Sequence, residues 1–400
     1  MRWLFMTNLY PKENEQAIRS KLKYNMYDAA NNLQWNILYG MNENGVKDMD
    51  VYNLLPVDSY PSGYTDWYVN GFDFSEGFCG RGKNVPFFNV KYLKRLFLNH
   101  PFVSYSKKWA RENPDAKVLI YSLHSTFLTA VKKMKQKNPS IKAYAIVADL
   151  PQFTSPTGNF IRRAFSRHNT KKIYSLLKYI DGFVLLTDQM AEKLNITQPH
   201  VVMEGIAPRS NTATAQQASE KEKNILYTGS MNSKYGILTL LEAFKQTQNE
   251  NYRLILCGLG DAEGVIAEHC ANDKRISYLG KVKYEDVLAL QRSATVLVNP
   301  RQNIEEFTKY SFPSKTMEYL ASGTPVVAYK LDGIPDEYDE YINYVPDNSP
   351  ASLARKIAEI CELPEEERRA MGAKGEKFVT EHKNAVAQTK KILDFIGAER

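Results

Sequence analysis

Short β-rich runs alternate with longer helical segments along nearly the whole chain, and this alternation restricts the fold more than any other feature. In the first half the strand-like runs are Trp3–Leu9, Trp35–Gly40, Val51–Val57, Val118–Leu123, Ala143–Asp149, Phe183–Thr187 and Val201–Glu204. The second half holds Ile225–Thr228, Arg253–Cys257, Ile276–Leu279, Thr295–Asn299, Pro325–Tyr329 and Tyr344–Val345. Such alternation predicts parallel sheets with helices on both faces, and these sheets bind ligands at the carboxyl ends of their strands.

A polar stretch separates the two series and divides the chain. A sequence of 400 residues is too long for one ordinary core, and residues 208–223, PRSNTATAQQASEKEK, have the composition of a linker. We therefore predict one α/β domain over residues 1–207 and a second over 224–380, followed by an amphipathic segment within 381–400.

The positive charge of the chain is concentrated in its first half. Residues 1–205 carry 27 Lys and Arg against 17 Asp and Glu, a net of +10, and residues 206–400 carry 25 against 28, a net of −3, which together give the +7 of the chain. Residues 77–111 contain no acid, and their basic residues are interleaved with aromatic ones. This segment is either a solvated face over core aromatics or a surface for anionic membrane lipid.

The cysteines and the hydropathy of the chain indicate its cellular compartment. The four cysteines are scattered without metal-ligand spacing, which favours a reduced, cytoplasmic setting. No apolar run approaches the roughly 18 residues of a membrane-spanning helix. Because no His/Cys cluster is present either, we expect neither a metal ion nor another cofactor.

One stretch carries the strongest chemical signal. Residues 309–329 read KYSFPSKTMEYLASGTPVVAY and predict a loop, a helix that begins near Pro313, a C-capping glycine and a buried strand. Ser311 and Ser314 are the candidate N-caps of that helix.

The start of this helix suits a nucleotide. Ser314, Lys315 and Glu318 lie three and four positions apart and share one face. Free backbone N–H groups and the helix dipole favour a diphosphate there, and Lys315 adds a cation. Glu318, one turn further, is placed to accept two neighbouring hydroxyls, as on a ribose. Together these features predict a nucleotide or a nucleotide-sugar as the ligand.

The run resembles the donor-site signature of retaining group-1 (family-four) glycosyltransferases, which have the GT-B fold. One branch of that family carries Pro-Ser/Asn-Lys-x-x-Glu-Tyr before a small residue, Gly and Pro-Val. The matching residues here are Pro313, Ser314, Lys315, Glu318, Tyr319, Gly323, Pro325 and Val326. The commoner form has the spacing Glu-x7-Glu. Its second glutamate matches Glu318, whereas its first falls on Tyr310, which cannot supply a carboxylate to the transferred sugar.

The resemblance implies two Rossmann-like domains whose parallel sheets face across a cleft, with a C-terminal helix, residues 381–400, that returns to the first domain. The second domain would hold the donor. Besides the run itself, the implied donor-binding residues are Gly229, Ser230, Lys234, Gly258, Lys281, Val282, Arg301, Tyr310, Ser311 and Phe312. In relatives the backbone near Lys281 and Val282 holds the base. Arg301 is either a ligand of the diphosphate or an ordinary surface arginine.

The loop after Thr228 departs from the family pattern. Gly229 allows the backbone to approach a phosphate, and Lys234 is a cation that would neutralise it. The family usually has Gly-Arg-x4-Lys-Gly here. Ser230 replaces the arginine, and Tyr235 stands in the place of the lysine.

Two strand ends in the first half carry the catalytic candidates, His124 and Asp149. In relatives a histidine often ends the earlier of these strands, and His124 matches it. Another histidine, which faces the transferred sugar, often follows the later strand, at the place of Ala148. A lone histidine at a strand end is more often structural, and an aspartate before Leu-Pro is often a turn residue. Both interpretations stay open at this point.

Together with the resemblance, these features indicate a retaining, metal-independent hexosyltransferase. It would move a hexose from an NDP-sugar, with UDP favoured, to a saccharide or polyprenyl-diphosphate-linked acceptor in the synthesis of a bacterial surface polysaccharide such as an exopolysaccharide or capsule. We expect it in the cytoplasm, peripheral on the inner face of the cell membrane, and we expect no nucleic acid partner. Two other classes share the fold: a nucleotide-sugar epimerase and a non-catalytic GT-B partner subunit. The second stays open because Tyr310 replaces the first glutamate of the Glu-x7-Glu pattern and Ala148 stands where relatives have a histidine.

Overall fold

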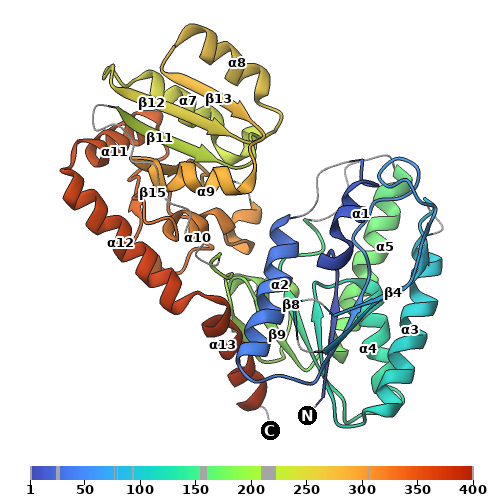
Figure 1. Cartoon of the computed structure of the whole chain (residues 1–400). Coiled ribbons are helices and arrows are strands. Elements are labelled where there is room, and N and C mark those ends of the chain that lie inside the picture. The colour runs from blue at the N-terminus through green and yellow to red at the C-terminus, as the bar shows by residue number, and fades with distance from the viewer. Residues whose placement is uncertain are drawn as a thin grey trace. The chain divides into compact units, whose positions relative to one another are not determined.

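The computed structural model describes residues 2–23, 28–75, 77–78, 80–91, 94–153, 160–208, 222–304 and 306–398. The chain divides into two compact units, residues 1–204 with 385–400 and residues 205–384. Each unit is built around its own parallel sheet, which helices cover (Figure 1). Most of the predicted linker, residues 209–221, lies outside the described residues.

The first unit contains, within the described residues, an eight-stranded sheet of order β10-β9-β8-β7-β1-β2-β5-β4. All neighbours are parallel except the edge pair β4 and β5. The strands are β1 (Trp3–Thr7), β2 (Met49–Asn53), β4 (Phe72–Phe74), β5 (Gly80–Asn84), β7 (Lys117–Tyr121), β8 (Lys142–Val147), β9 (Gly182–Leu185) and β10 (His200–Val202). A separate antiparallel ribbon pairs β3 (Tyr68–Val69) with β6 (Phe87–Phe88). Every residue of β1 is buried, as expected of a parallel strand covered on both faces.

Helices from both ends of the chain cover this sheet. They are α1 (Glu15–Arg19), α2 (Asp28–Glu43), α3 (Lys94–Glu112), α4 (Ser125–Lys135), α5 (Phe160–Leu176), α6 (Gln189–Leu194) and the C-terminal α13 (Ala385–Ala398), with 3-10 turns η1 (Lys12–Asn14) and η2 (Leu177–Tyr179). The last helix belongs to the first unit and packs on α2 (Figure 1). A Cβ on Gly40 would lie 2.1 Å from the Ala385 carbonyl oxygen, so this glycine permits the close helix contact.

The run Trp35–Gly40 is not a strand, contrary to the prediction from sequence, because it lies inside α2. The buried side chains of this helix recur at intervals of three and four residues. They include Asn31, Gln34, Trp35, Leu38 and Met41. The apolar run alone was too short to distinguish the two periods, and only the longer window reveals the helix.

The second unit contains, among the described residues, a six-stranded parallel sheet of order β13-β12-β11-β14-β15-β16. Its strands are β11 (Lys223–Thr228), β12 (Tyr252–Cys257), β13 (Ile276–Gly280), β14 (Val296–Asn299), β15 (Val326–Ala328) and β16 (Asn343–Tyr344). Its helices are α7 (Ile237–Lys245), α8 (Glu263–Asn272), α9 (Tyr284–Ser293), α10 (Ser314–Leu320), α11 (Pro350–Glu362) and α12 (Glu365–His382). The 3-10 turns are η3 (Ser233–Tyr235), η4 (Glu306–Tyr310) and η5 (Asp336–Tyr338).

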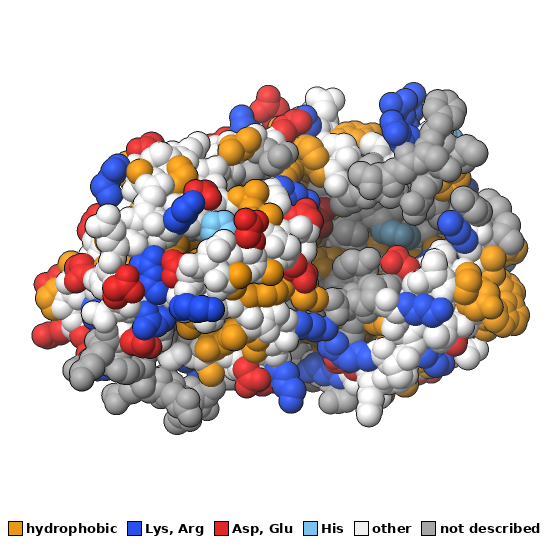
Figure 2. Space-filling model, turned by 90° about the horizontal axis from the view of Figure 1, so that it is seen from above, with side chains coloured by type: hydrophobic (Ala, Val, Ile, Leu, Met, Phe, Trp, Pro, Cys, Tyr) orange, Lys and Arg blue, Asp and Glu red, His pale blue; other side chains and the backbone are white. Residues whose placement is uncertain are grey.

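Alternate residues of the second sheet enter two different cores. Ile225 packs into the cluster beneath α7 and α11, whereas its neighbour Leu226 packs into the cluster with Met317 of α10. Burial of both faces explains why the central residues of these strands are mostly apolar, and it confirms the predicted parallel sheet. Outside the cores, Figure 2 shows acidic and basic side chains intermixed on the visible face of this unit.

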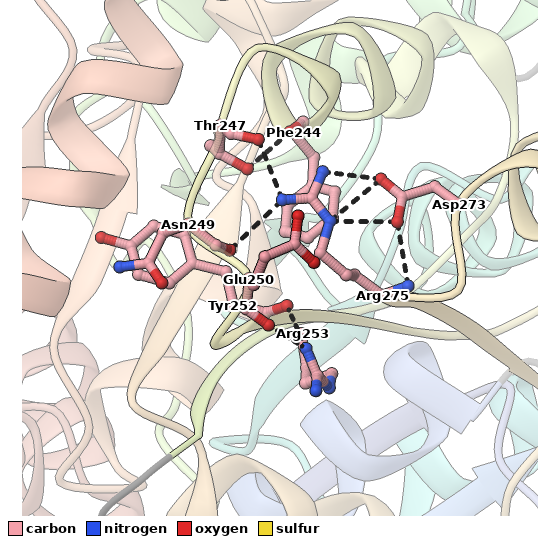
Figure 3. A network of polar contacts seen from close by, with 8 residues as sticks. All are labelled: Phe244, Thr247, Asn249, Glu250, Tyr252, Arg253, Asp273 and Arg275. Atoms are coloured by element: carbon pink, nitrogen blue, oxygen red, sulfur yellow. Dashed lines mark hydrogen bonds and ion pairs between the residues drawn. The ribbon is translucent and has the colours of Figure 1, made fainter.

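An arginine clamp fastens the loops at the amino ends of β12 and β13 (Figure 3). Arg275 donates from Nε to Oδ1 of Asp273 over 3.0 Å and from Nη2 to Oδ2 over 2.7 Å, which lowers the pKa of the Asp273 carboxyl. Its Nη1 donates to the carbonyls of Thr247, at 2.9 Å, and Asn249, at 3.2 Å. The guanidinium also lies 4.9 Å from the ring centroid of Phe244. These contacts lie at the sheet edge opposite the ligand-binding one, so we assign the clamp a structural role.

Candidate functional site

Two glycines bring the loops at the carboxyl edge of the second sheet into backbone contact. Gly229 follows β11, and Gly258 follows β12 with a φ of +145°. A Cβ on Gly258 would lie 1.7 Å from the Gly229 carbonyl oxygen, so only glycine fits there. The Gly258 carbonyl accepts a hydrogen bond of 2.7 Å from the Tyr278 hydroxyl. The backbones of these two loops therefore pack directly against each other at this edge.

The loop after Gly229 presents a lysine beside two aromatic rings. Ser230 maintains the loop, because its Oγ accepts from Asn232 Nδ2 over 2.6 Å. Lys234 is exposed on η3, and its Nζ lies 5.1 Å from the ring centroid of Tyr235 and 5.6 Å from that of Phe307.

Arg301, which follows β14, is buried beside the same two rings. It is 9% exposed, and its guanidinium carbon lies 4.7 Å from the Phe307 centroid and 5.7 Å from the Tyr235 centroid. Its Nη2 donates to Ser311 Oγ over 2.8 Å, whereas its Nε has no hydrogen-bond partner among the described residues. Burial lowers the pKa of this guanidinium. A guanidinium thus lies close to Lys234 although the family's usual arginine is absent from the loop.

The helix of the donor-site run begins one residue later than expected. α10 starts at Ser314, with Pro313 in the N-cap position and no side-chain cap bond. Neither Ser311 nor Ser314 caps the helix, which corrects the prediction. Ser314 is already helical, and the Ser311 hydroxyl instead donates to the Phe307 carbonyl over 3.1 Å.

Lys315 and Glu318 meet on one side of α10, where both are partly buried. Lys315 Nζ lies 2.6 Å from Glu318 Oε1. The same oxygen accepts a 2.6 Å hydrogen bond from Gln291 Nε2, which also donates to Thr228 Oγ1 over 2.8 Å. Gln291 is fully buried, and reasoning from sequence missed it because nothing around a glutamine inside α9 marks it as part of a site.

Aromatic side chains fix this run to the sheet. The buried Tyr319 hydroxyl accepts from the Thr228 amide over 2.8 Å and donates to the Thr228 carbonyl over 2.9 Å. The Phe312 ring is also buried, 5.2 Å from the ring of Tyr338. Tyr310 ends η4 and is half-buried.

The two base-site candidates lie after β13. Lys281 is exposed, and Val282 is half-buried against the core of this unit. The next aromatic residue, Tyr284, is 43% exposed. Partial burial raises the pKa of Tyr284 to about 12, and the negative charge of Glu318 adds to the rise. Reasoning from sequence missed Tyr284, although an aromatic residue at the start of the helix after β13 was a usable signal.

The first unit holds both catalytic candidates in one cavity of about 530 Å³. The cavity lies at the carboxyl ends of β7 and β8, where Tyr121, His124, Ala148 and Asp149 line it. Helix α5 contributes Phe165, His168 and Lys172, which reasoning from sequence did not select.

Asp149 and His124 have different surroundings in this cavity. Asp149 reaches solvent, yet the cavity walls desolvate its carboxyl enough to raise its pKa. His124 occupies the N-cap position of α4, and its ring lies 5.1 Å from the ring of Phe127. Ser122 has a φ of +63°, an unusual conformation for a residue other than glycine and one that often occurs at functional sites.

No cluster of three or more His, Cys, Asp and Glu side chains with metal-binding geometry occurs among the described residues. The chain contains one Asp-x-Asp sequence, formed by Asp48, which directly precedes β2, and Asp50, the second residue of that strand. Asp50 forms an ion pair with Arg2, whose Nη2 lies 3.1 Å from Asp50 Oδ2. The same oxygen accepts a hydrogen bond of 2.6 Å from Trp109 Nε1. In the described part of the chain, no helix combines the length and the apolar character needed to cross a membrane.

Comparison with known families places this site in context. Residues 209–378 match the family model for glycosyl transferases group 1. A D-inositol 3-phosphate glycosyltransferase of Corynebacterium kroppenstedtii is 26% identical over 211 residues, which are 48% of this chain and 45% of that protein. The chain thus spans less than half the length of this curated relative.

Solved structures resemble the whole chain. Sucrose-phosphate synthase of Thermosynechococcus elongatus has a TM-score of 0.68 at 16% identity and covers 100% of this chain and 99% of its own. The UDP-forming trehalose-phosphate synthase of Burkholderia xenovorans, in complex with glucose-6-phosphate, has a TM-score of 0.64 at 10% identity, over 99% of this chain and 100% of its own. The lipopolysaccharide outer core galactosyltransferase WaaB has a TM-score of 0.61 at 12% identity over 100% of both chains.

Proposed function

We propose that this chain, which has the GT-B fold and a group 1 glycosyltransferase domain in its second unit, is a hexosyltransferase that retains anomeric configuration. It takes a hexose from a UDP-sugar and transfers it to a saccharide or polyprenyl-diphosphate-linked acceptor of a surface polysaccharide, in the cytoplasm. The fold neighbours support this choice, because one is a UDP-forming synthase and another a galactosyltransferase of the lipopolysaccharide outer core.

The observation that carries the proposal is the environment of Arg301. A guanidinium that is nine-tenths buried without a paired carboxylate among the described residues is costly. An anionic ligand offsets that cost and occupies the remaining donor, Nε. Lys234 lies beside the same two rings, so two cations converge in the loops that follow β11 and β14, at the carboxyl edge of the sheet. A diphosphate matches this concentration of positive charge.

Lys315 and Glu318 complete the nucleotide site. The two side chains pair with each other, and the Glu318 side chain is only 13% exposed. When a nucleotide binds, Lys315 can turn to the diphosphate and free Glu318 to accept the ribose hydroxyls. Lys315 and Arg301 then stabilise the departing diphosphate, which is the role of a metal ion in other transferases, so we propose a metal-independent reaction.

The cavity of the first unit is the proposed acceptor site. Asp149, whose pKa burial raises, exchanges a proton closer to neutral pH than an ordinary aspartate does. A carboxyl group of this kind suits the orientation or deprotonation of an acceptor hydroxyl. His124 supplies a second polar group in the same cavity.

Thermal stabilisation by nucleotide-sugars tests the donor site. UDP-hexoses should raise the unfolding temperature of the wild-type protein, and Arg301→Met should lose that increase. Arg369→Met is the matched control, because Arg369 is an exposed arginine paired with Glu365 on α12. An equal response of the Arg301 variant and the wild type would remove the basis of the proposal.

A transfer assay with the same UDP-hexoses then separates the functional classes. Product with the donor's anomeric configuration supports a retaining transferase. Release of an altered sugar without any acceptor identifies an epimerase instead, and the absence of stabilisation by every nucleotide-sugar identifies a subunit without donor binding.

A further inference from the structure

Four aromatic side chains form a cluster on the surface of the first unit. Trp67 precedes β3, Tyr68 lies in β3, Phe88 in β6 and Phe97 in α3. The Phe88 ring is at the centre, with centroid distances of 5.8 Å to Trp67, 5.0 Å to Tyr68 and 5.2 Å to Phe97. Trp67 is 57% exposed, Phe97 44% and Phe88 39%. Single exposed rings are common, but a contiguous group of them marks an interaction surface.

The pairing of β3 with β6 explains why these rings face outward. Tyr68 lies opposite Phe88, and Val69 lies opposite Phe87. Because side chains alternate between the two faces of a ribbon, burial of Val69 and Phe87 turns Tyr68 and Phe88 to the other face.

Helix α3 extends this surface with positive charge. Its exposed residues recur at intervals of seven, four and three, at Phe97, Ser104, Lys108 and Arg111. Residues at these intervals share one face of a helix. Another face packs into the unit and on α4 (Figure 1), and its buried residues are Leu98, Phe102, Ser106 and Trp109. One exposed face of α3 therefore combines an aromatic ring of the cluster with two cations.

Little negative charge opposes these cations. Residues 77–111 contain eight Lys and Arg and no acid. Asp66, beside Trp67, is already paired with Lys21 over 2.7 Å. Glu112 ends α3 as an exposed acid next to Arg111, and the two exposed cations of the helix face keep its net charge positive.

We infer that this surface docks on an anionic phospholipid bilayer, with Lys108 and Arg111 against the lipid phosphates and the rings of Trp67 and Phe97 among the headgroups. The positive charge complements an anionic leaflet, and amphipathic aromatic rings settle at the membrane–water interface. Because the other rings all contact Phe88, the cluster offers one compact apolar surface. Nucleic acid bases instead stack on separate open ring faces.

Docking through α3 has a consequence for the proposed acceptor site. Asn99, on the same helix, lines the cavity that holds Asp149, and its Oδ1 accepts from Thr126 over 2.7 Å. A docked α3 would hold this cavity close to the bilayer, where a polyprenyl-linked acceptor resides. This consequence rests on the proposed function, whereas the docking depends only on the surface itself.

The tryptophans of the chain provide a probe for the docking. All four lie in the described residues, and Trp3, Trp35 and Trp109 are buried, so solvent reaches chiefly Trp67. Vesicles of phosphatidylglycerol in phosphatidylcholine should shift the emission of the full chain to the blue and protect it from quenching by acrylamide. Phosphatidylcholine alone should do neither. Trp67→Phe should keep vesicle binding and remove the shift.

Sedimentation with the same vesicles tests the cations. Each basic residue near an anionic surface strengthens binding about fivefold, so Lys108→Gln, Arg111→Gln should bind roughly 25-fold more weakly. Lys108→Arg, Arg111→Lys conserves the charge and should bind as the wild type does. Arg167→Gln, Lys171→Gln removes the same charge from exposed positions of α5 in the same unit and should leave binding unchanged.

A second pair of variants tests the rings. Trp67→Ser, Phe97→Ser should abolish the part of the binding that survives high salt, because charge attraction is screened and insertion is not. Val265→Ser, at an exposed apolar position of α8, should bind as the wild type does. Unfolding temperatures equal to that of the wild type show that these surface variants fold.

Three outcomes with vesicles would overturn the inference: equal pelleting with both lipid compositions, a loss of binding in the α5 variant as large as in the α3 variant, or a Trp67 that acrylamide still quenches on pelleted protein. An emission shift with soluble polysaccharide or RNA, and none with vesicles, would overturn it as well. None of these measurements involves UDP, so a protein that fails to bind UDP would contradict the proposed function and leave the docking result valid.

Discussion

At the scale of single residues, Glu318 has the most specific proposed role. Its Oε1 atom accepts from both Lys315 and Gln291, so the carboxylate is already positioned before a ligand arrives. A ribose that presents two hydroxyls can replace the contact with Lys315, whereas a 2′-deoxyribose offers only one hydroxyl there.

We expect Glu318→Ala to weaken UDP binding by about 1–3 kcal/mol, the cost of losing hydrogen bonds to a charged group. The variant should also lose the preference for UDP over 2′-deoxy-UDP, measured by titration calorimetry. Glu359→Ala serves as the control, because Glu359 is an exposed acid paired with Lys356. An unchanged preference in the Glu318 variant would remove this residue from the ribose site.

Asp149 allows a prediction about pH. Desolvation raises its pKa in the folded chain, so the folded state holds this proton more tightly than the unfolded state does. Unfolding then releases a proton between the two pKa values, and the contribution of Asp149 to stability falls as the pH rises through that interval. Asp149→Asn should therefore raise the unfolding temperature at about pH 7, and the gain should shrink towards about pH 4, near the ordinary aspartate pKa. A constant gain at both pH values would contradict a raised pKa.

At the scale of elements, the second sheet depends on how its loops are fastened. Figure 3 shows Arg275 between the loop that follows α7 and the loop that precedes β13. Its hydrogen bonds reach Asp273 and two backbone carbonyls, so one side chain joins these two loops.

Arg275→Leu should lower the free energy of unfolding by about 2–3 kcal/mol, because it removes charge-assisted hydrogen bonds and leaves backbone carbonyls without a donor. Arg369→Leu, which removes the exposed ion pair with Glu365, should cost less than about 1 kcal/mol. Chemical denaturation of both variants makes the comparison. Equal losses would show that the clamp is no more than a surface ion pair.

At the scale of the whole molecule, the two units divide the proposed chemistry. We propose that the second unit supplies cations for the diphosphate from three separate segments: Lys234 on η3, Arg301 after β14 and Lys315 on α10. The first unit supplies a cavity with a carboxyl of raised pKa.

Because protein cations are proposed to take over the role of a metal ion, hexose transfer should continue at its full rate in EDTA. The assay compares initial rates with and without the chelator. If EDTA abolished transfer and Mn²⁺ or Mg²⁺ restored it, the lysine and arginine side chains alone would be insufficient to stabilise the departing diphosphate.

Several features followed from the sequence alone because their causes are local. Uncharged β-rich runs favour strands buried on both faces, which predicted the parallel sheets. Residues spaced by three and four on one helix must be neighbours, which predicted the pair Lys315 and Glu318. The run Trp35–Gly40 marks the limit of this reasoning, because a short apolar run fits either period. The edge strand β5, with the sequence GRGKN, has no β-rich run at all and is held by pairing with β2.

Only the tertiary structure decided which distant residues act together. Arg301 and Lys234 lie far apart in the chain, and they converge because both approach the rings of Tyr235 and Phe307. Gln291 joins Glu318 to Thr228 from a helix whose sequence gives no hint of it. Trp109, in the basic and aromatic segment 77–111, is buried, whereas Phe165 on α5 is exposed. Each of these outcomes depends on which faces the packed elements cover, and that is a property of the assembled fold rather than of any local run of residues.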